Sequence, residues 1–420
     1  MSDKEFLRKN KSFYKSIMTL ASGSIIAQCI TILISPIMTR IYSPEEIGVF
    51  TLVTSIIGIF GPILSLRYES MIVPEEDNLD TYSLIVVSTF ICIILSIITT
   101  IGYGLYFFLI KNMGLISFIT SFFILLLLII TGLLNILIAY NNKLKEYKLM
   151  TSVYILRTAF QNAFLILFGC MGLGSMGLLS SNLIGNFAGV KRQSLSLQKN
   201  LTEIKQLTMS DLRRVLVKYK KQAILSTPAY FLNSFSYSSL NLFIENLFGT
   251  AILGYYSISY RILGMPLTVV SSNVSKVFFE NAAKEYNDYG EITKSLHRTC
   301  LFLLPLAILL FIGLYISSYF FPLIFGSDWV EAGTYIRILA PLFSIKLIAS
   351  TIDGPAFLIT SHQQYDLYIR ISLVLCSIMD FLYCSMFDRT IIDFLIYYSG
   401  IVSSLNIFTI IIVFKIKRKK

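Results

Sequence analysis

Four basic side chains stand inside long apolar segments of this sequence: Arg157, Arg261, Lys346 and Arg370. An arginine keeps its proton in proteins, so a guanidinium held away from bulk water needs an acid, trapped water or an anionic ligand. Guanidinium forks also match the geometry of phosphate oxygens. We therefore predict that these four cations bind a diphosphate. The alternative for Lys346 and Arg370 is a structural ion pair, or a side chain that extends to the membrane surface.

The elements that must position these residues are membrane-spanning helices. The chain has 420 residues, of which 55% are hydrophobic and 14% charged, with a mean hydropathy of +0.71. A soluble protein of this size needs more charge to cover its surface. The apolar runs are long enough to cross roughly 30 Å of hydrocarbon as helices. We predict an all-α polytopic membrane protein with twelve transmembrane helices, at 17–39, 47–66, 82–110, 115–140, 151–170, 174–190, 222–245, 252–273, 299–321, 333–357, 366–387 and 391–414.

The positive charges fall mainly on one side of these spans. With a cytoplasmic N-terminus, 27 of the 35 Lys and Arg residues face the cytoplasm, and only Arg40, Lys111 and Arg389 face the opposite side. Lys and Arg mark cytoplasmic loops, so we predict that both termini are cytoplasmic. The net charge of +11 is then a topology signal. No separate basic domain is available for nucleic acid, which we exclude as a partner.

The chain repeats itself. A shift of 206 residues aligns Gly48 with Gly254 and places "YSPEEIGVFTLVTSI" over "LFGTAILGYYSISYRI". Two sets of six spans that start on the same side form a parallel repeat, related by an axis along the membrane normal. We predict two six-helix lobes, 1–190 and 222–420, joined by a basic cytoplasmic linker, 191–221. The end of this linker, "SDLRRVLVKYKK", is either an amphipathic surface helix or a solvated segment.

Polar residues follow one helix face in the equivalent first and seventh spans. In the first, Gln28 shares a face with Ser24, Thr31 and Ser35; in the seventh, polar residues recur every four positions, at Asn233, Tyr237, Asn241 and Glu245. We predict that Gln28, Asn233 and Asn241 line a hydrated cleft. For the serines and threonines, ordinary helix–helix hydrogen bonding with small-residue packing is the better interpretation.

Three acids also lie in the spans: Glu245, Asp353 and Asp380. A carboxylate near lipid needs water or a partner, so we predict that these acids bind a coupling ion. Lys346 and Asp353 are seven residues apart, hence on one helix face, and are placed to pair.

Enzymatic motifs find no support. The segment "GLGSMG" at 172–177 matches GxGxxG, but a dinucleotide site needs a preceding strand and a following amphipathic helix. Here membrane spans flank it, which favours a tight hairpin. Neither GxxxxGK[ST] nor HExxH occurs in the sequence. We predict no catalytic residues and no metal site, and therefore a protein that is not an enzyme.

Two stretches carry a resemblance to a known family. "ASGSIIAQCITILISPIMTRIYSPEEIGVFTLVTSI" and the following "RYESMIVPEED" resemble the first-span pattern and the arginine-tyrosine-glutamate turn of the Wzx-type O-antigen flippases. These form the polysaccharide-biosynthesis branch of the multidrug/oligosaccharidyl-lipid/polysaccharide exporter superfamily. The twelve-span plan is similar end to end, while the motif similarity is confined to about residues 20–80.

This resemblance implies two six-helix lobes in a V around a central cavity, working by alternating access. It implies an undecaprenyl-diphosphate-linked oligosaccharide as substrate, moved between leaflets of the bacterial inner membrane for O-antigen, capsule or other surface polysaccharide. A proton or sodium gradient would drive transport without a cofactor. Membrane lipids, a polysaccharide polymerase and a chain-length regulator are the implied partners. Arg67 and Glu69, in the matched turn, would then form a latch at the cytoplasmic gate, besides ending the second span.

Two other function classes stay open. A drug or organic-cation antiporter of the same superfamily would require a net acidic cavity, whereas cations outnumber acids in the middle of these spans. A membrane-embedded polysaccharide polymerase or transferase usually requires a large extracytoplasmic loop, and the predicted outer loops are short. A relative with fourteen spans that moves peptidoglycan precursor fits less well than a twelve-span protein.

Overall fold

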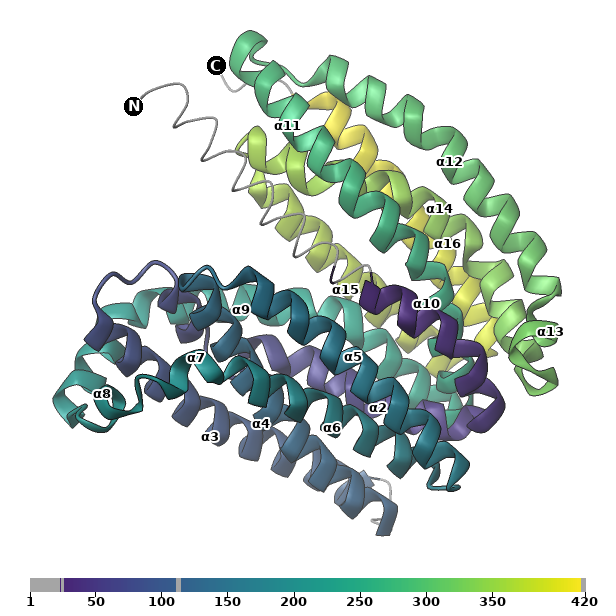
Figure 1. The fold of residues 1–420 in the computed structure, drawn as a ribbon. Coiled ribbons are helices and arrows are strands. Elements are labelled where there is room, and N and C mark those ends of the chain that lie inside the picture. Colours follow the sequence, from purple (N-terminus) through teal and green to yellow (C-terminus); the bar gives the residue numbers. More distant parts are fainter. Residues whose placement is uncertain (1–22, 24–25, 111–114, 417–420) are drawn as a thin grey trace. The chain divides into compact units, whose positions relative to one another are not determined.

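The computed structural model describes residues 23, 26–110 and 115–416, and every regular element in these residues is a helix (Figure 1). After the helix Ile26–Ile41 the elements are α2 (Pro44–Phe60), η1 (Gly61–Ile63), η2 (Tyr68–Ile72), α3 (Asn78–Ile110), α4 (Leu115–Lys143), α5 (Tyr147–Cys170), α6 (Gly174–Gln193), α7 (Leu195–Gln198), α8 (Leu201–Lys205), α9 (Met209–Phe248), α10 (Thr250–Pro266), η3 (Leu267–Ser271), α11 (Ser272–Tyr289), α12 (Thr293–Tyr319), α13 (Phe321–Phe325), η4 (Ser327–Trp329), α14 (Val330–Ile359), α15 (Gln363–Met386) and α16 (Ile391–Lys415).

Nine helical segments of the described residues are long and apolar enough to cross a membrane, and Ile26–Ile41 is a shorter apolar helix. The chain is therefore an all-α polytopic membrane protein, as the sequence predicts. The predicted spans 174–190 and 222–245 are also helical, within α6 and α9, but they are not among the nine segments. The first part of the predicted span 17–39 lies outside the described residues.

Local sequence signals explain where several helices begin. In α2, Ser43 and Glu46 form a capping box: the Glu46 side chain accepts from the Ser43 N–H at 2.8 Å, and the Ser43 hydroxyl accepts from the Glu46 N–H at 3.3 Å. Pro44 stands at the first helical position, where its missing N–H costs nothing. Thr390 and Asp393 form the same motif at the start of α16.

The helical path continues beyond the eighth predicted span. That span was predicted to end at residue 273, but η3 and α11 extend the helical path to Tyr289. Pro266 has no N–H to donate, and the π-turn η3 follows it directly. In α11, Phe278 and Ala282 are buried in one apolar cluster with Ile352 of α14. Four charged residues of α11 are exposed, so the amphipathic pattern is that of a packed helix: Lys276, Glu280, Lys284 and Asp288.

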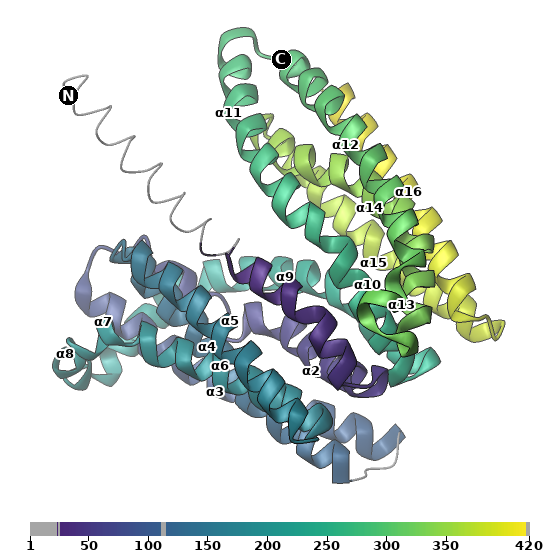
Figure 2. The ribbon, with the colours of Figure 1, turned by 45° about the vertical axis from the view of Figure 1, so that its right-hand side comes forward.

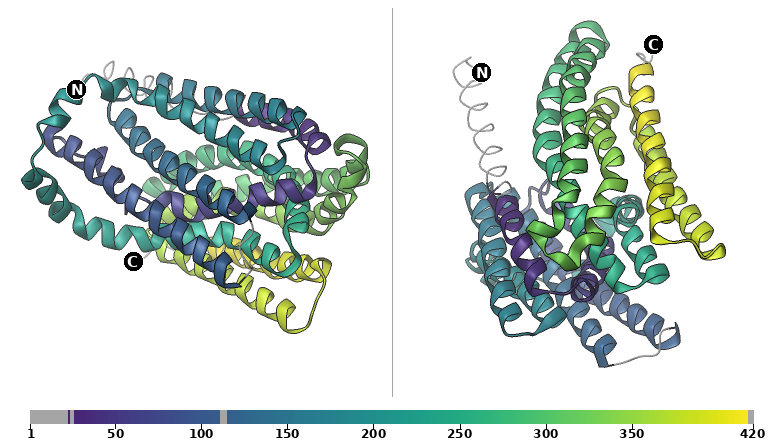
Figure 3. Two further views of the ribbon diagram at one scale, coloured as in Figure 1. Left: turned by 90° about the horizontal axis from the view of Figure 1, so that it is seen from below. Right: turned by 90° about the vertical axis from the view of Figure 1, so that its right-hand side faces the viewer.

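The chain forms two compact units, each with its own packing. One comprises Met1–Tyr42 with Val53–Ser238, and the other Ser43–Leu52 with Ser239–Lys420. In the first, α4 packs against both α3 and α6, and α5 packs along α6 (Figure 2). In the second, α14 is the central helix, in contact with α10, α11, α12 and α16 (Figure 3). Half of α14 is buried, because its neighbours cover it along most of its length.

The basic segment 191–221 is mostly helical. It contains α7, α8 and the first three turns of α9, which continues without a break to Phe248. Val215 and Ala223 of α9 are buried in an apolar cluster with Tyr68, Tyr82 and residues of α4. The apolar face of this segment therefore packs on protein, and its charged residues occupy the other faces.

Within the second unit, α2 and α10 cross at two glycines. A Cβ atom on Gly48 would lie 1.7 Å from the carbonyl oxygen of Thr250, and one on Gly254 would lie 1.8 Å from that of Pro44. Thr250 and Gly254 are the positions equivalent to Pro44 and Gly48 under the shift of 206 residues. The contact is therefore reciprocal, and the sequence repeat reappears as a local pseudo-two-fold crossing. Helices in membranes often pack through such small residues.

This crossing predicts a strong effect for a single methyl group. Gly254→Ala should destabilise the protein by about 1–3 kcal/mol or more, because the methyl meets backbone that cannot rotate away. Gly264→Ala, in the same helix, is the matched control, since nothing lies within 4 Å of its added Cβ. Thermal unfolding of the two purified variants in the same detergent measures the difference. Equal melting temperatures would contradict the close crossing.

Candidate functional site

A cavity of about 370 Å³ lies inside the first unit, among α2, η1, α4, α5 and α6. Its apolar part comes from α2 and η1. Its polar lining consists of Thr54, Thr131, Asn135, Arg157, Asn182 and Asn186. Arg157 is the one charged residue in this lining, so the cavity carries a net positive charge.

Close packing of α5 on α6 positions Arg157. Gly185 and Gly189 of α6 are four residues apart and form a small-residue face. A Cβ on Gly185 would lie 2.8 Å from the Arg157 carbonyl oxygen, and one on Gly189 would lie 2.5 Å from Cδ of the Arg157 side chain. The aliphatic part of Arg157 therefore lies across the α6 backbone, which directs the guanidinium along α6 toward Asn186.

One asparagine bonds the guanidinium group, and a second asparagine bonds the first. Nη2 of Arg157 donates a hydrogen bond to Oδ1 of Asn186, and Nδ2 of Asn186 donates to Oδ1 of Asn182 at 2.6 Å. Both asparagines are neutral. None of the ion pairs formed by the described residues includes Arg157. An anion in this cavity would supply the missing opposite charge.

The second unit contains the other three predicted diphosphate ligands. Arg261 is partly buried in α10, directly after Tyr260. Nζ of Lys346, in α14, lies 5.9 Å from the centre of the Tyr260 ring. Arg370 of α15 pairs with Asp366 one turn earlier, at 3.2 Å. Lys346 is thus adjacent to the α10 segment that carries Arg261.

Among the predicted coupling acids, Asp353 and Asp380 have different surroundings. Asp353 accepts a hydrogen bond from the N–H of Gly354 at 2.6 Å, and the charges of Arg370 and Lys346 act on it. Asp380 is 3% exposed, and Oδ1 lies 3.8 Å from the Sγ donor of Cys384. Its Oδ2 has no hydrogen-bond partner among the described residues.

The remaining predicted cleft residues are divided between the units. Gln28 is half-buried and Asn233 is exposed, both in the first unit. Asn241 is half-buried and Glu245 is buried, both in the second. The hydroxyls of Thr31 and Ser35 donate to carbonyls of their own helix, at 3.0 and 2.8 Å, whereas hydrogen bonds between helices were predicted for the hydroxyl residues.

Arg67 and Glu69 form an ion pair at 2.9 Å in the turn after η1. Arg67 adopts a left-handed conformation with φ of 64°, and its guanidinium stacks on the Tyr230 ring at 3.7 Å. Glu69 is buried and also accepts from the Ser65 hydroxyl at 2.6 Å. This pair therefore connects the turn with α9 inside the first unit.

A second charge cluster, next to this turn, was not predicted from the sequence. Lys218 of α9 donates to Glu75 and to Asp80, at 2.7 Å each. Arg214 donates to Asp80 at 2.6 Å, and the Tyr219 hydroxyl donates to Glu75. The two sides are more than 130 residues apart in sequence. In the sequence, only the opposite charges of these residues indicate that they interact, and opposite charge does not specify which residues pair.

This cluster changes the titration of Glu75. Burial alone would raise the pKa of the carboxyl, but the hydrogen bonds from Lys218 and Tyr219 outweigh it and lower the pKa from 4.5 to about 2. Hydrogen bonds with Asp80 and Glu75 in turn raise the pKa of Lys218. The start of α9 is therefore tied to the segment before α3 by charges that stay ionised at neutral pH.

Several solved structures have a similar fold. The structure "Lipid II flippase MurJ, inward closed conformation" is similar with a TM-score of 0.69 at 12% identity, over 96% of this chain and 88% of that one. An inward-facing multidrug resistance MATE family transporter of the MOP superfamily matches with a TM-score of 0.55 at 12% identity, over 94% and 92%. A eukaryotic MATE transporter gives 0.54 at 16%, over 98% and 97%. The chain therefore has the fold that these MATE transporters and MurJ share.

The family follows from the sequence. Residues 37–334 match the family model described as "Polysaccharide biosynthesis protein", and the chain belongs to that family. No curated protein matches the chain in sequence. The resemblance found in residues 20–80 is thus confirmed at the level of family and fold.

The Glu75 cluster gives a pH-dependent prediction. Glu75→Gln should destabilise the protein by about 1–3 kcal/mol at neutral pH, because Lys218 loses a charged acceptor. A carboxylate with a lowered pKa contributes its stability above its unfolded value of 4.5 and loses it as pH falls toward about 2. The difference from the wild type should therefore shrink across that window.

Glu76→Gln, the exposed neighbour, is the control. A constant difference from pH 7 to pH 3, measured by thermal unfolding, would contradict the assignment.

Proposed function

We propose that this protein translocates undecaprenyl-diphosphate-linked oligosaccharides across the bacterial inner membrane, from the cytoplasmic to the periplasmic leaflet, for surface polysaccharide synthesis. Family membership supports a role in polysaccharide biosynthesis. The fold supports a transporter, and one protein with this fold is a lipid II flippase. The particular lipid-linked substrate is our inference from the charged cavity.

The observation that carries the proposal is the environment of Arg157. Its guanidinium lines the cavity, and its hydrogen-bond partner among the described residues is the neutral Asn186, which in turn bonds Asn182. A structural arginine would be expected to face a carboxylate, since an uncompensated buried charge is costly. A cavity for an organic cation would carry the opposite sign. A diphosphate satisfies both the charge and the fork geometry.

In this proposal the other predicted residues act around the same substrate. Arg261, Lys346 and Arg370 contribute further positive charge in the C-terminal lobe, 222–420. Alternating access moves this lobe against the N-terminal lobe, 1–190, with 191–221 as their cytoplasmic connection. Gln28, Asn233 and Asn241 line the hydrated path. The Arg67–Glu69 pair holds the cytoplasmic gate, a placement that assumes the orientation given by the Lys and Arg distribution.

We further propose that buried acids couple transport to a proton or sodium gradient. Asp380 is the strongest of the three predicted acids because it is buried with one oxygen unpartnered among the described residues. A carboxyl oxygen in such a place is open to a proton, a cation or water as its missing partner. Glu245 and Asp353 are the alternatives.

Removal of the Arg157 guanidinium tests the substrate assignment. Arg157→Ala should lower surface polysaccharide about tenfold or more in cells that depend on this protein, because a charge-assisted contact of about 1.5–3 kcal/mol is lost. Arg157→Lys should be intermediate, since it keeps the charge and loses the fork. Arg389→Ala removes an exposed cation and serves as the control. Undiminished polysaccharide in Arg157→Ala at equal protein level would refute the diphosphate role.

Neutralisation of Asp380 tests the coupling. In proteoliposomes, Asp380→Asn should abolish the acceleration of transport by an imposed proton or sodium gradient, while exchange of substrate without a gradient persists. The amide keeps the shape of the side chain and cannot release a proton. Asp353→Asn under the same conditions identifies which acid couples. Gradient-driven transport at the wild-type rate in the Asp380 variant would exclude this residue.

A further inference from the structure

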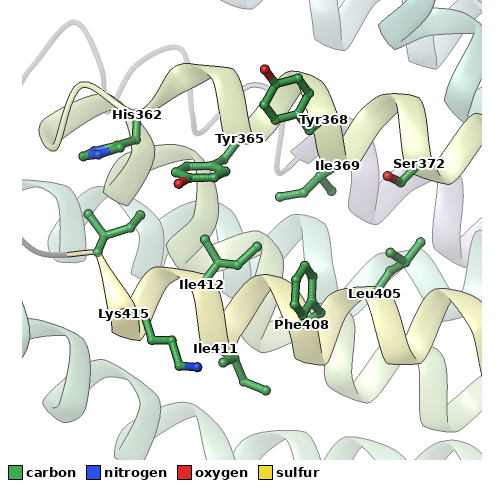
Figure 4. Close-up of a pocket in the computed structure, with 11 residues that line it drawn as sticks. His362, Tyr365, Tyr368, Ile369, Ser372, Leu405, Phe408, Ile411, Ile412 and Lys415 are labelled. Atoms are coloured by element: carbon green, nitrogen blue, oxygen red, sulfur yellow. The ribbon is translucent and has the colours of Figure 1, made fainter.

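The second unit has a groove between the first half of α15 and the last half of α16, with a volume of about 610 Å³ (Figure 4). The two helices pack side by side as an antiparallel hairpin. Ile369 and Ile412 lie along its floor and also pack on the apolar core of this unit. Leu405, Phe408 and Ile411 line it along α16. The groove is therefore apolar along these residues, and its floor rests on the hydrophobic core of the second unit.

One end of this groove is polar. His362 precedes the first turn of α15, and Lys415 is in the last turn of α16, so the two side chains come to the same end (Figure 4). The His362 ring stacks on Tyr365 at 5.8 Å. Its Nδ1 is buried and has no hydrogen-bond partner among the described residues. Lys415 is exposed and supplies a positive charge at the mouth.

The sides of the groove are exposed. Tyr368 and Phe408 are each 58% exposed although they belong to helices that are long and apolar enough to cross a membrane. Apolar residues with similar exposure continue along both helices, at Leu375, Met379, Ile407 and Ile411. A ligand with an apolar chain and a polar head at the membrane surface fits such a groove.

From these features we propose that the α15–α16 groove is a binding site for an anionic glycerophospholipid. One acyl chain lies along Ile369, Leu405 and Phe408, and the phosphodiester meets the exposed Lys415 at the mouth. A lysine is a compact point charge, which suits a singly charged phosphodiester. The diphosphate of the proposed substrate is matched instead by the guanidinium of Arg157. The site goes beyond the proposed function and does not depend on it.

The experiment uses the full-length protein in vesicles and a reporter inside the groove. The chain has one tryptophan, Trp329, which is buried in η4 before α14. Phe408→Trp adds a second indole within the groove, and the parent protein gives the Trp329 background. Brominated acyl chains quench this added fluorescence on contact. Brominated phosphatidylglycerol is compared with brominated phosphatidylcholine at equal mole fraction.

We expect phosphatidylglycerol to bind about fivefold more tightly than phosphatidylcholine, the preference given by one lysine near a membrane surface. In the Phe408→Trp protein, the additional substitution Lys415→Gln should reduce the ratio of the two lipid affinities to about one. Lys284→Gln, which removes an exposed lysine of α11, should leave the ratio unchanged. Ser372→Phe fills the groove while Lys415 stays in place, and should also abolish the preference.

Two outcomes would overturn the proposal. Equal quenching by the two lipids in the Phe408→Trp protein would exclude an anionic lipid site. If unbrominated undecaprenyl phosphate displaces the brominated lipid better than unbrominated phosphatidylglycerol does, the groove holds a prenyl chain and the glycerophospholipid assignment is wrong. Size-exclusion profiles identical to the parent's establish that each variant is folded, so a lost preference reports on the site.

Discussion

The central constraint on this molecule is that a guanidinium cannot give up its charge inside a membrane. Arg157 meets this constraint through a hydrogen bond to Asn186, which bonds Asn182 in turn, and through an open cavity, and no carboxylate of the described residues pairs with it. The amide of Asn186 solvates the cation without neutralising it. In our proposal the site therefore keeps an affinity for anions that an ion pair would remove.

Glycine packing makes that arrangement possible. Lipid tails are as apolar as leucine, so membrane helices gain little from the hydrophobic effect and associate through close backbone contact. Gly189 lets the Arg157 stem lie on α6. Gly48 and Gly254 let α2 and α10 cross at backbone distance, at positions related by the internal repeat. In both places a single methyl group is enough to disturb the geometry on which the rest depends.

Outside the spans, charge is used in the opposite way. Glu75, Asp80 and Lys218 are matched acid to base, and they hold the first turns of α9 to the segment before α3. The resulting low pKa of Glu75 keeps this tie intact at neutral pH. The same chain thus compensates its charges fully where a helix must be anchored. It leaves charge uncompensated where, in our proposal, a substrate binds.

The sequence by itself determined the class of the protein, because long apolar runs require helices that cross a membrane. Residues 20–80 also contain the motifs that resemble the family. It also located Arg157 and Asp380, because charged residues inside such runs are costly and conspicuous. Only the tertiary structure decided what surrounds them. The asparagines beside Arg157, the partners of Glu75 and the α15–α16 groove all depend on residues far apart in the chain. Periodicity gives the face on which a residue lies, but the neighbour across that face is set by packing, which sequence spacing does not encode.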